Sequence, residues 1–103
     1  QSFNSRANGL KYFLKTLPKD CVGFGAAARA SVMISATGIK LKYVVDENPL
    51  KQGKVMPGTD IPIVPLSELK DDNIVILAWP FADEIKKKVL KIRPKARFYV
   101  PDL

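Results

Sequence analysis

The chain of 103 residues contains no histidine and one cysteine, Cys21. Without histidine, no imidazole can act as a general base, and no Ser-His-Asp triad can form. A lone cysteine makes neither an internal disulfide nor a cysteine-based zinc site. Because Cys21 lies in an apolar run, we expect a buried thiol and not a nucleophile. We therefore predict no catalytic residue and no metal ligand in this chain.

Long apolar runs are also absent. The longest, residues 74–79, is far shorter than the roughly 18 residues that cross a bilayer. No signal-like segment opens the chain. We therefore expect a cytoplasmic protein that does not bind membranes. The hydrophobic content of 47% and the charged content of 26% are typical of one globular domain. We expect that domain to be part of a larger protein.

The net charge is +7, and residues 83–97 hold seven basic side chains against two acidic ones. This cluster indicates a solvated helix face, or a surface that meets an acidic part of the larger protein. Nucleic-acid binding is not favoured, because no aromatic residues interleave the cluster and no recognised binding motif is present.

Apolar runs and helical periodicities alternate along the chain. We predict strands at 21–24, 41–45, 61–64, 74–78 and 97–100, helices at 26–37 and 80–92, and a helical turn at 67–69. The second helix should bury a stripe of Phe81, Ile85, Val89 and Ile92. Right-handed crossovers then give an α/β fold, a small Rossmann-like three-layer α/β/α domain with about five parallel strands in the order 3-2-1-4-5.

An amphipathic pattern precedes this unit. Leu10, Phe13, Leu14 and Leu17 recur at helical spacing, and Pro18 ends the pattern. We predict a connecting helix over residues 1–18 and the Rossmann-like domain over 19–103.

A glycine motif follows the first predicted strand. Gly23, Gly25 and Ala28 have G-x-G-x-x-A spacing, which in this context permits a tight turn and brings backbone N–H groups close to a phosphate. Asp46 directly follows the second predicted strand. Its distance along the chain from Gly25 is the one expected for an acid that binds ribose hydroxyls. Two alternatives stay open: the glycines could serve only strand-to-helix packing, and Asp46 could cap the loop that follows it.

Three blocks of sequence carry a resemblance to a known family. They are Gly-Phe-Gly-Ala-Ala-Ala-Arg at 23–29, the segment 45–63 with its three prolines and two glycines, and the segment 76–85 around Trp79. The run from Val22 to Pro101 resembles the C-terminal domain of S-adenosylmethionine-dependent C-methyltransferases that act on nucleotide-linked deoxysugars. Phe24, Ala27 and Arg29 stand where that family usually has tyrosine, proline and lysine, and Pro80 stands where asparagine is common.

The resemblance implies a division of labour. A preceding methyltransferase domain of the same protein would bind S-adenosylmethionine and remove the proton next to a keto group, while this domain helps to form the nucleotide-sugar cleft. No cofactor is expected in the chain itself, and no methyl transfer by it alone. The alternative is a stand-alone nucleotide-binding module for NAD(P), coenzyme A or a nucleotide-sugar.

The cleft should lie at the carboxyl ends of the strands. Arg29 or Lys51 would offset phosphate charge, Asp46 would accept hydroxyl hydrogen bonds, and Trp79 would stack on a base or sugar. Solvated basic side chains and a core tryptophan are the alternatives. The candidate substrate-binding residues are Gly23, Phe24, Gly25, Ala26, Arg29, Asp46, Asn48, Lys51, Gln52, Gly58, Trp79 and Pro80. Prolines and glycines should also keep the 47–60 loop ordered.

Overall fold

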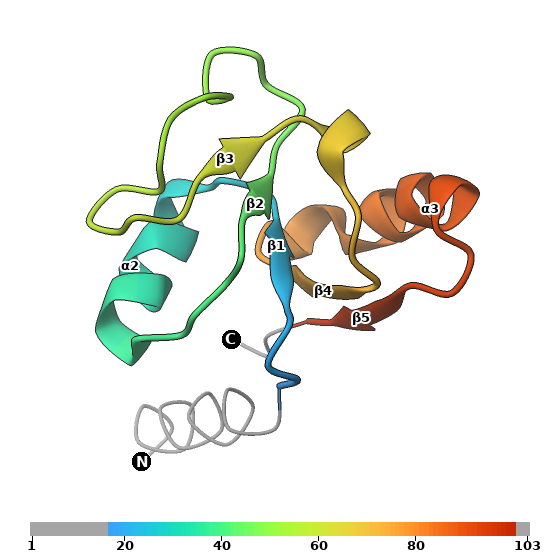
Figure 1. Cartoon of the computed structure of the whole chain (residues 1–103), viewed down its shortest axis with the longest axis horizontal. Coiled ribbons are helices and arrows are strands. Elements are labelled where there is room, and N and C mark those ends of the chain that lie inside the picture. The colour runs from blue at the N-terminus through green and yellow to red at the C-terminus, as the bar shows by residue number, and fades with distance from the viewer. Residues whose placement is uncertain (1–16, 101–103) are drawn as a thin grey trace.

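The structure is a computed structural model that describes residues 17–100. Its sheet contains β1 (Val22–Phe24), β2 (Val44–Val45), β3 (Ile63–Val64), β4 (Asn73–Ile76) and β5 (Arg97–Tyr99). All neighbouring strands are parallel, in the order β3-β2-β1-β4-β5 (Figure 1). The predicted fold class and strand order are therefore confirmed. The predicted helix within residues 1–18 falls almost entirely outside the described residues.

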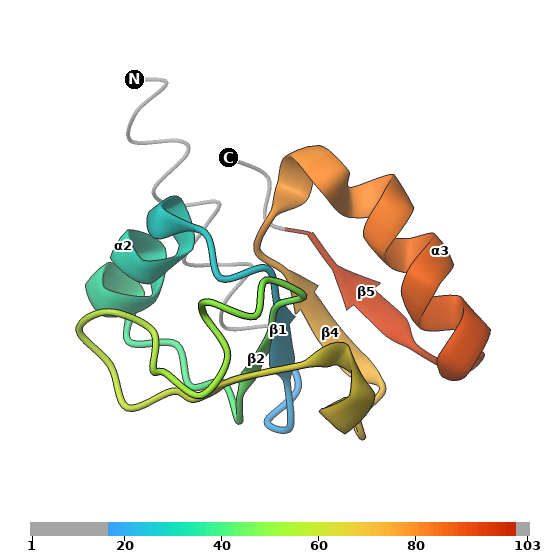
Figure 2. The same ribbon diagram turned by 90° about the horizontal axis from the view of Figure 1, so that it is seen from above.

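Helices cover both faces of the sheet. Figure 2 shows α2 (Ala28–Thr37) and α3 (Ala82–Ile92) on opposite sides of it. Two short 3₁₀ turns, η1 (Leu66–Glu68) and η2 (Trp79–Phe81), precede β4 and α3. The helix predicted at 26–37 begins at Ala28, two residues later than predicted, because Ala27 has an extended backbone. Within residues 17–100, no helix has the length and apolar character needed to span a membrane.

The hydrophobic core has two parts, one on each side of the central strands. Ile74 and Ile76 of β4 join the α3-side cluster, whereas Val75 joins the α2-side cluster, and all three are fully buried. This burial on both faces is why a central parallel strand reads as an unbroken apolar run. Cys21 is also buried, as predicted, and its thiol donates to the Pro18 carbonyl at 3.1 Å. Burial, with a contribution from Asp20, raises the pKa of Cys21, which keeps the thiol protonated.

The predicted apolar stripe on the second helix is only half correct. Ile85 and Val89 are buried on the sheet side of α3. Phe81 is 58% exposed and Ile92 is 52% exposed. Phe81 belongs to η2, so the 3.6-residue spacing of the α-helix does not place it, and Ile92 is the last residue of α3. The sequence therefore assigned to the core a phenylalanine that lies at the surface.

The long loop after β2 folds back over the free edge of β3 (Figure 1). Ile63 donates to the Lys54 carbonyl at 2.8 Å, and Met56 donates to the Ile61 carbonyl at 2.8 Å. An antiparallel bridge joins Val55 to Pro62. The side chain of Met56 is fully buried in the α2-side core. The loop thus pairs an edge strand that would otherwise stay open.

Tyr43, just before β2, ties the sheet to the segment that leads into β4. Its hydroxyl donates to Asp71 Oδ2 at 2.6 Å and accepts from the Lys70 N–H at 2.9 Å. Burial, with the hydrogen bond to Asp71, raises the pKa of Tyr43 to about 12. The phenol therefore remains a neutral donor at physiological pH.

Candidate functional site

The carboxyl ends of β1 and β4 meet at the point where the strand order reverses. The chain leaves β1 toward α2 on one face and leaves β4 toward α3 on the other. Open α/β sheets bind ligands at such a switch point. A pocket of about 190 Å³ lies here, and we call it the switch-point pocket. Its lining residues are Phe24, Gly25, Asp46, Glu47, Ala78, Phe81, Glu84, Ile85 and Lys88.

The glycines of the motif are required by close packing. Gly25 has φ of +101°, and a Cβ there would lie 2.5 Å from Ala78 Cβ and 3.0 Å from Ala78 N. A Cβ on Gly23 would lie 2.7 Å from a methyl group of Leu77. These contacts are with residues at the ends of neighbouring strands and not with a helix, so the glycines have a packing role other than the strand-to-helix packing considered above. This packing also brings Gly25 and Ala78 together in the wall of the switch-point pocket.

Asp46 joins the turn after β1 to the long loop. Its Oδ2 accepts from the Ala26 N–H at 2.7 Å, and its Oδ1 accepts from the Asn48 N–H at 2.8 Å. The capping role is therefore present in the structure. Each carboxylate oxygen has a second lone pair, so the carboxylate can still accept a ligand hydroxyl. That ligand role stays a prediction.

Lys51 and Gln52 of the loop bond to backbone carbonyls at the ends of β1 and β2. Lys51 Nζ donates to the Ala26 carbonyl at 2.7 Å, and Gln52 Nε2 donates to the Asp46 carbonyl at 2.9 Å. Asn48 Oδ1 accepts from the Leu50 N–H at 3.0 Å. Lys51 thus holds its ammonium group beside the turn after β1, with two N–H groups left over. The Lys51 and Gln52 bonds tie the loop to the turn after β1 and to the end of β2, whereas the Asn48 bond lies within the loop.

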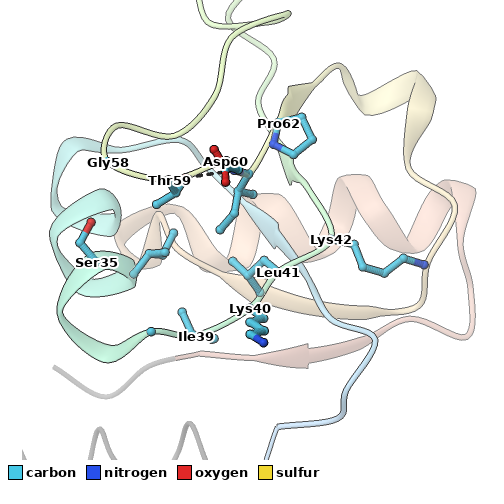
Figure 3. A pocket seen from close by; sticks show the side chains of 12 residues that line it. Ser35, Ile39, Lys40, Leu41, Lys42, Gly58, Thr59, Asp60 and Pro62 are labelled. Carbon is cyan, nitrogen blue, oxygen red and sulfur yellow. Dashed lines mark hydrogen bonds between the residues drawn. The ribbon is translucent and has the colours of Figure 1, made fainter.

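The remaining predicted residues are spread more widely. Arg29 is exposed in the first turn of α2, a helix without a side-chain N-cap. Trp79 and Pro80 lie in η2 between two lining residues of the switch-point pocket, but they do not line it. Gly58 lies elsewhere, in a pocket of about 480 Å³ between α2 and residues 58–62 (Figure 3). That pocket lies near the amino ends of β2 and β3, whereas the switch-point pocket lies at the carboxyl ends of the strands.

Six lining residues were not among the predicted site residues: Glu47, Ala78, Phe81, Glu84, Ile85 and Lys88. Lys88 Nζ and Glu47 Oε1 form an ion pair of 2.8 Å that connects α3 to the loop, with both side chains about half exposed. The hydrogen bond to Glu47 raises the pKa of Lys88, and the charge of Glu84 adds to this. The i, i+4 spacing of Glu84 and Lys88 was the available signal, because it predicts that both lie on one side of a helix.

The lining of the switch-point pocket combines hydrogen-bond acceptors with apolar surface. Residues 17–100 contain no cluster of three or more His, Cys, Asp or Glu side chains that could hold a metal ion. Hydrogen-bond acceptors are provided by Asp46, Glu47 and Glu84, and apolar surface by Phe24, Phe81 and Ile85. The pocket can therefore orient a polar ligand.

Replacing Asp46 with alanine should destabilise the chain by about 2 kcal/mol, because two backbone N–H groups lose a charged acceptor. If Asp46 also accepts ligand hydroxyls, the folded variant should bind nucleotide-sugars on the order of tenfold more weakly. Chemical denaturation and calorimetric titration measure the two effects separately. Asp60→Ala, which removes an exposed carboxylate from the same loop, should stay within about 0.5 kcal/mol of wild type. Equal stability of both variants would contradict the capping role.

Comparison with known proteins adds two findings. A family model described as the C-methyltransferase C-terminal domain matches residues 4–101. The C-methyltransferase NovU of Streptomyces niveus is 34% identical to the chain, in an alignment that covers 81% of the chain and 21% of NovU. The chain thus spans about a fifth of the length of this relative.

Proposed function

Because the chain belongs to the C-methyltransferase C-terminal domain family, we propose that it forms one wall of the nucleotide-sugar cleft in an S-adenosylmethionine-dependent sugar C-methyltransferase. A preceding domain of the same protein would bind the cofactor and transfer the methyl group. The resemblance seen in the sequence and the similarity to a C-methyltransferase support this proposal. The cytoplasmic location expected from the sequence is part of it.

The observation that carries the proposal is the position of the switch-point pocket. It lies at the carboxyl ends of β1 and β4, next to the Gly25–Ala26 turn and the start of α2. Small-molecule sites usually enclose roughly 300–1,000 Å³, whereas this pocket encloses about 190 Å³. It therefore accommodates part of a nucleotide-sugar. We assign S-adenosylmethionine to the preceding domain because the resemblance of the sequence to the methyltransferase family implies it.

The basic groups nearest to the turn define a phosphate side. The first N–H groups of α2 have no side-chain cap, and Arg29 lies in its first turn. Lys51 holds its ammonium group against the Ala26 carbonyl. A helix N-terminus with adjacent cations is a favourable place for phosphate. In this arrangement Trp79, in η2, would stack on the base or sugar.

The role of the chain would be to bind and orient the sugar, not to remove its proton. The sequence has no histidine, and both oxygens of the Asp46 carboxylate already accept backbone N–H groups. The resemblance of the sequence to the methyltransferase family implies that the base comes from the preceding domain. The stand-alone nucleotide-binding module is not favoured, because the matching family model describes a methyltransferase domain.

Calorimetric titration tests the proposal with a nucleotide-linked keto-deoxysugar, NAD and coenzyme A as separate ligands. The nucleotide-sugar should bind in preference to both cofactors. Arg29→Ala should weaken that binding on the order of tenfold through the loss of a phosphate contact. Lys87→Ala removes the same charge from the exposed side of α3 and should leave the affinity nearly unchanged. Preferential binding of NAD or coenzyme A would contradict the proposal.

A further inference from the structure

We infer that the switch-point pocket is the subsite for an uncharged, hydroxylated ring of the ligand, and that the phosphates lie outside it. This inference rests on the proposed function, because it assigns the parts of a nucleotide-sugar to the two sides of the Gly25–Ala26 turn. The ring is either the sugar that accepts the methyl group or the ribose, which share the same chemistry: hydroxyl groups on an apolar carbon framework.

The first argument concerns the apolar side of the pocket. Phe81 lines it and is 58% exposed, although phenylalanine usually lies in the core. Ala78 and the buried Ile85 continue this apolar surface. A sugar ring presents C–H groups on its faces, and these pack well against an aromatic ring. The fold does not explain why Phe81 is exposed at this place. Contact with a ligand ring explains it.

The second argument concerns charge. Three carboxylates line the pocket, those of Asp46, Glu47 and Glu84, against the single ammonium group of Lys88. Lys88 already forms an ion pair with Glu47. The lining is therefore net negative, and like charges close to a phosphate oppose its binding. Ligand hydroxyls, by contrast, are donors, and ionised carboxylates only accept hydrogen bonds.

The third argument is the position of two basic side chains, Arg29 and Lys51, outside the pocket. Arg29 lies in α2, which packs on the opposite face of the sheet from α3. Lys51 bonds to the Ala26 carbonyl and does not line the pocket. A nucleotide-sugar that crosses the turn would therefore meet cations with its phosphates and carboxylates with its ring. This distribution fixes the direction in which the ligand lies.

Two pairs of variants test the inference in the chain. Phe81→Ala removes the aromatic ring from the pocket, and Leu90→Ala is its control on α3, at an exposed position outside the pocket. Glu84→Ala removes an acceptor from the pocket, and the neighbouring Asp83→Ala removes an exposed carboxylate that does not line it. Each variant is titrated with the nucleotide-sugar, with the matching nucleoside diphosphate and with inorganic pyrophosphate.

Both pocket variants should bind the nucleotide-sugar about tenfold more weakly than their controls. Their affinity for pyrophosphate should equal that of wild type. If the bound ring is the sugar, the nucleoside diphosphate should keep its affinity; if it is the ribose, that affinity should fall in parallel. Tighter binding of pyrophosphate to Glu84→Ala would place the phosphates in the pocket and overturn the inference. Unchanged nucleotide-sugar affinity in both variants would also overturn it and leave the proposed function standing. Failure of the full-length protein, with its preceding domain, to bind any nucleotide-sugar would refute the proposed function itself.

Discussion

Replacing Gly25 with alanine should lower the free energy of unfolding by about 4 kcal/mol. Part of this loss comes from the backbone, because φ of +101° lies in a region that residues with a side chain rarely adopt. The rest comes from overlap, since the new Cβ would lie 2.5 Å from Ala78 Cβ and 3.0 Å from Ala78 N. Ala78 and the preceding Leu77 both donate their N–H groups to the Phe24 carbonyl, so the Ala78 backbone cannot move as the tip of a flexible side chain would.

Gly38 provides the matched control for this prediction. It also has positive φ, +69°, as the C-cap of α2, but within residues 17–100 no atom beyond its own neighbours in the chain lies within 4 Å of a Cβ built there. Gly38→Ala should therefore cost only the conformational part, about 1 kcal/mol. Denaturant unfolding of both variants measures the difference between them, which is the energy of the overlap. Equal losses would show that the contact between the turn after β1 and Ala78 relaxes freely.

The second large effect is expected at Met56, the only residue of segment 47–60 classed as buried. Met56→Ala should destabilise the chain by about 3 kcal/mol, because it leaves a cavity where a fully buried side chain stood. The loop that covers β3 should also open more often. Amide exchange of the Gly53 and Met56 N–H groups, both bonded across to the β3 segment, should then become faster.

Val55 tests whether this effect arises from burial. It precedes Met56 and takes part in the same antiparallel bridge, but it is 50% exposed. Val55→Ala should change stability by less than about 0.5 kcal/mol and leave exchange in the loop unaltered. If it destabilises the loop as much as Met56→Ala does, the loop is held by its backbone pairing and not by the buried methionine.

Part of the candidate site, Phe24, Gly25 and Asp46, was accessible from the sequence. The spacing of Gly23, Gly25 and Asp46 predicted a turn and an acid at one edge of a parallel sheet, and the structure brings Gly25 and Asp46 into one pocket. The roles of Lys51 and Gln52 were less accessible, because bonds to the Ala26 and Asp46 carbonyls depend on how the loop folds back. Helical periodicity likewise misplaced Phe81, since it takes no account of the 3₁₀ turn before α3.

The sequence by itself determined the alternation of strands and helices, the parallel sheet and its order, because buried strands and amphipathic helices have different periods and crossovers have one hand. It also determined the absence of imidazole chemistry, since composition does not depend on folding. Only the tertiary structure decided which side chains share the switch-point pocket. Glu47 and Lys88 are 41 residues apart in the chain and 2.8 Å apart in space, and the local pattern around either residue says nothing about a partner that the sheet and α3 bring near.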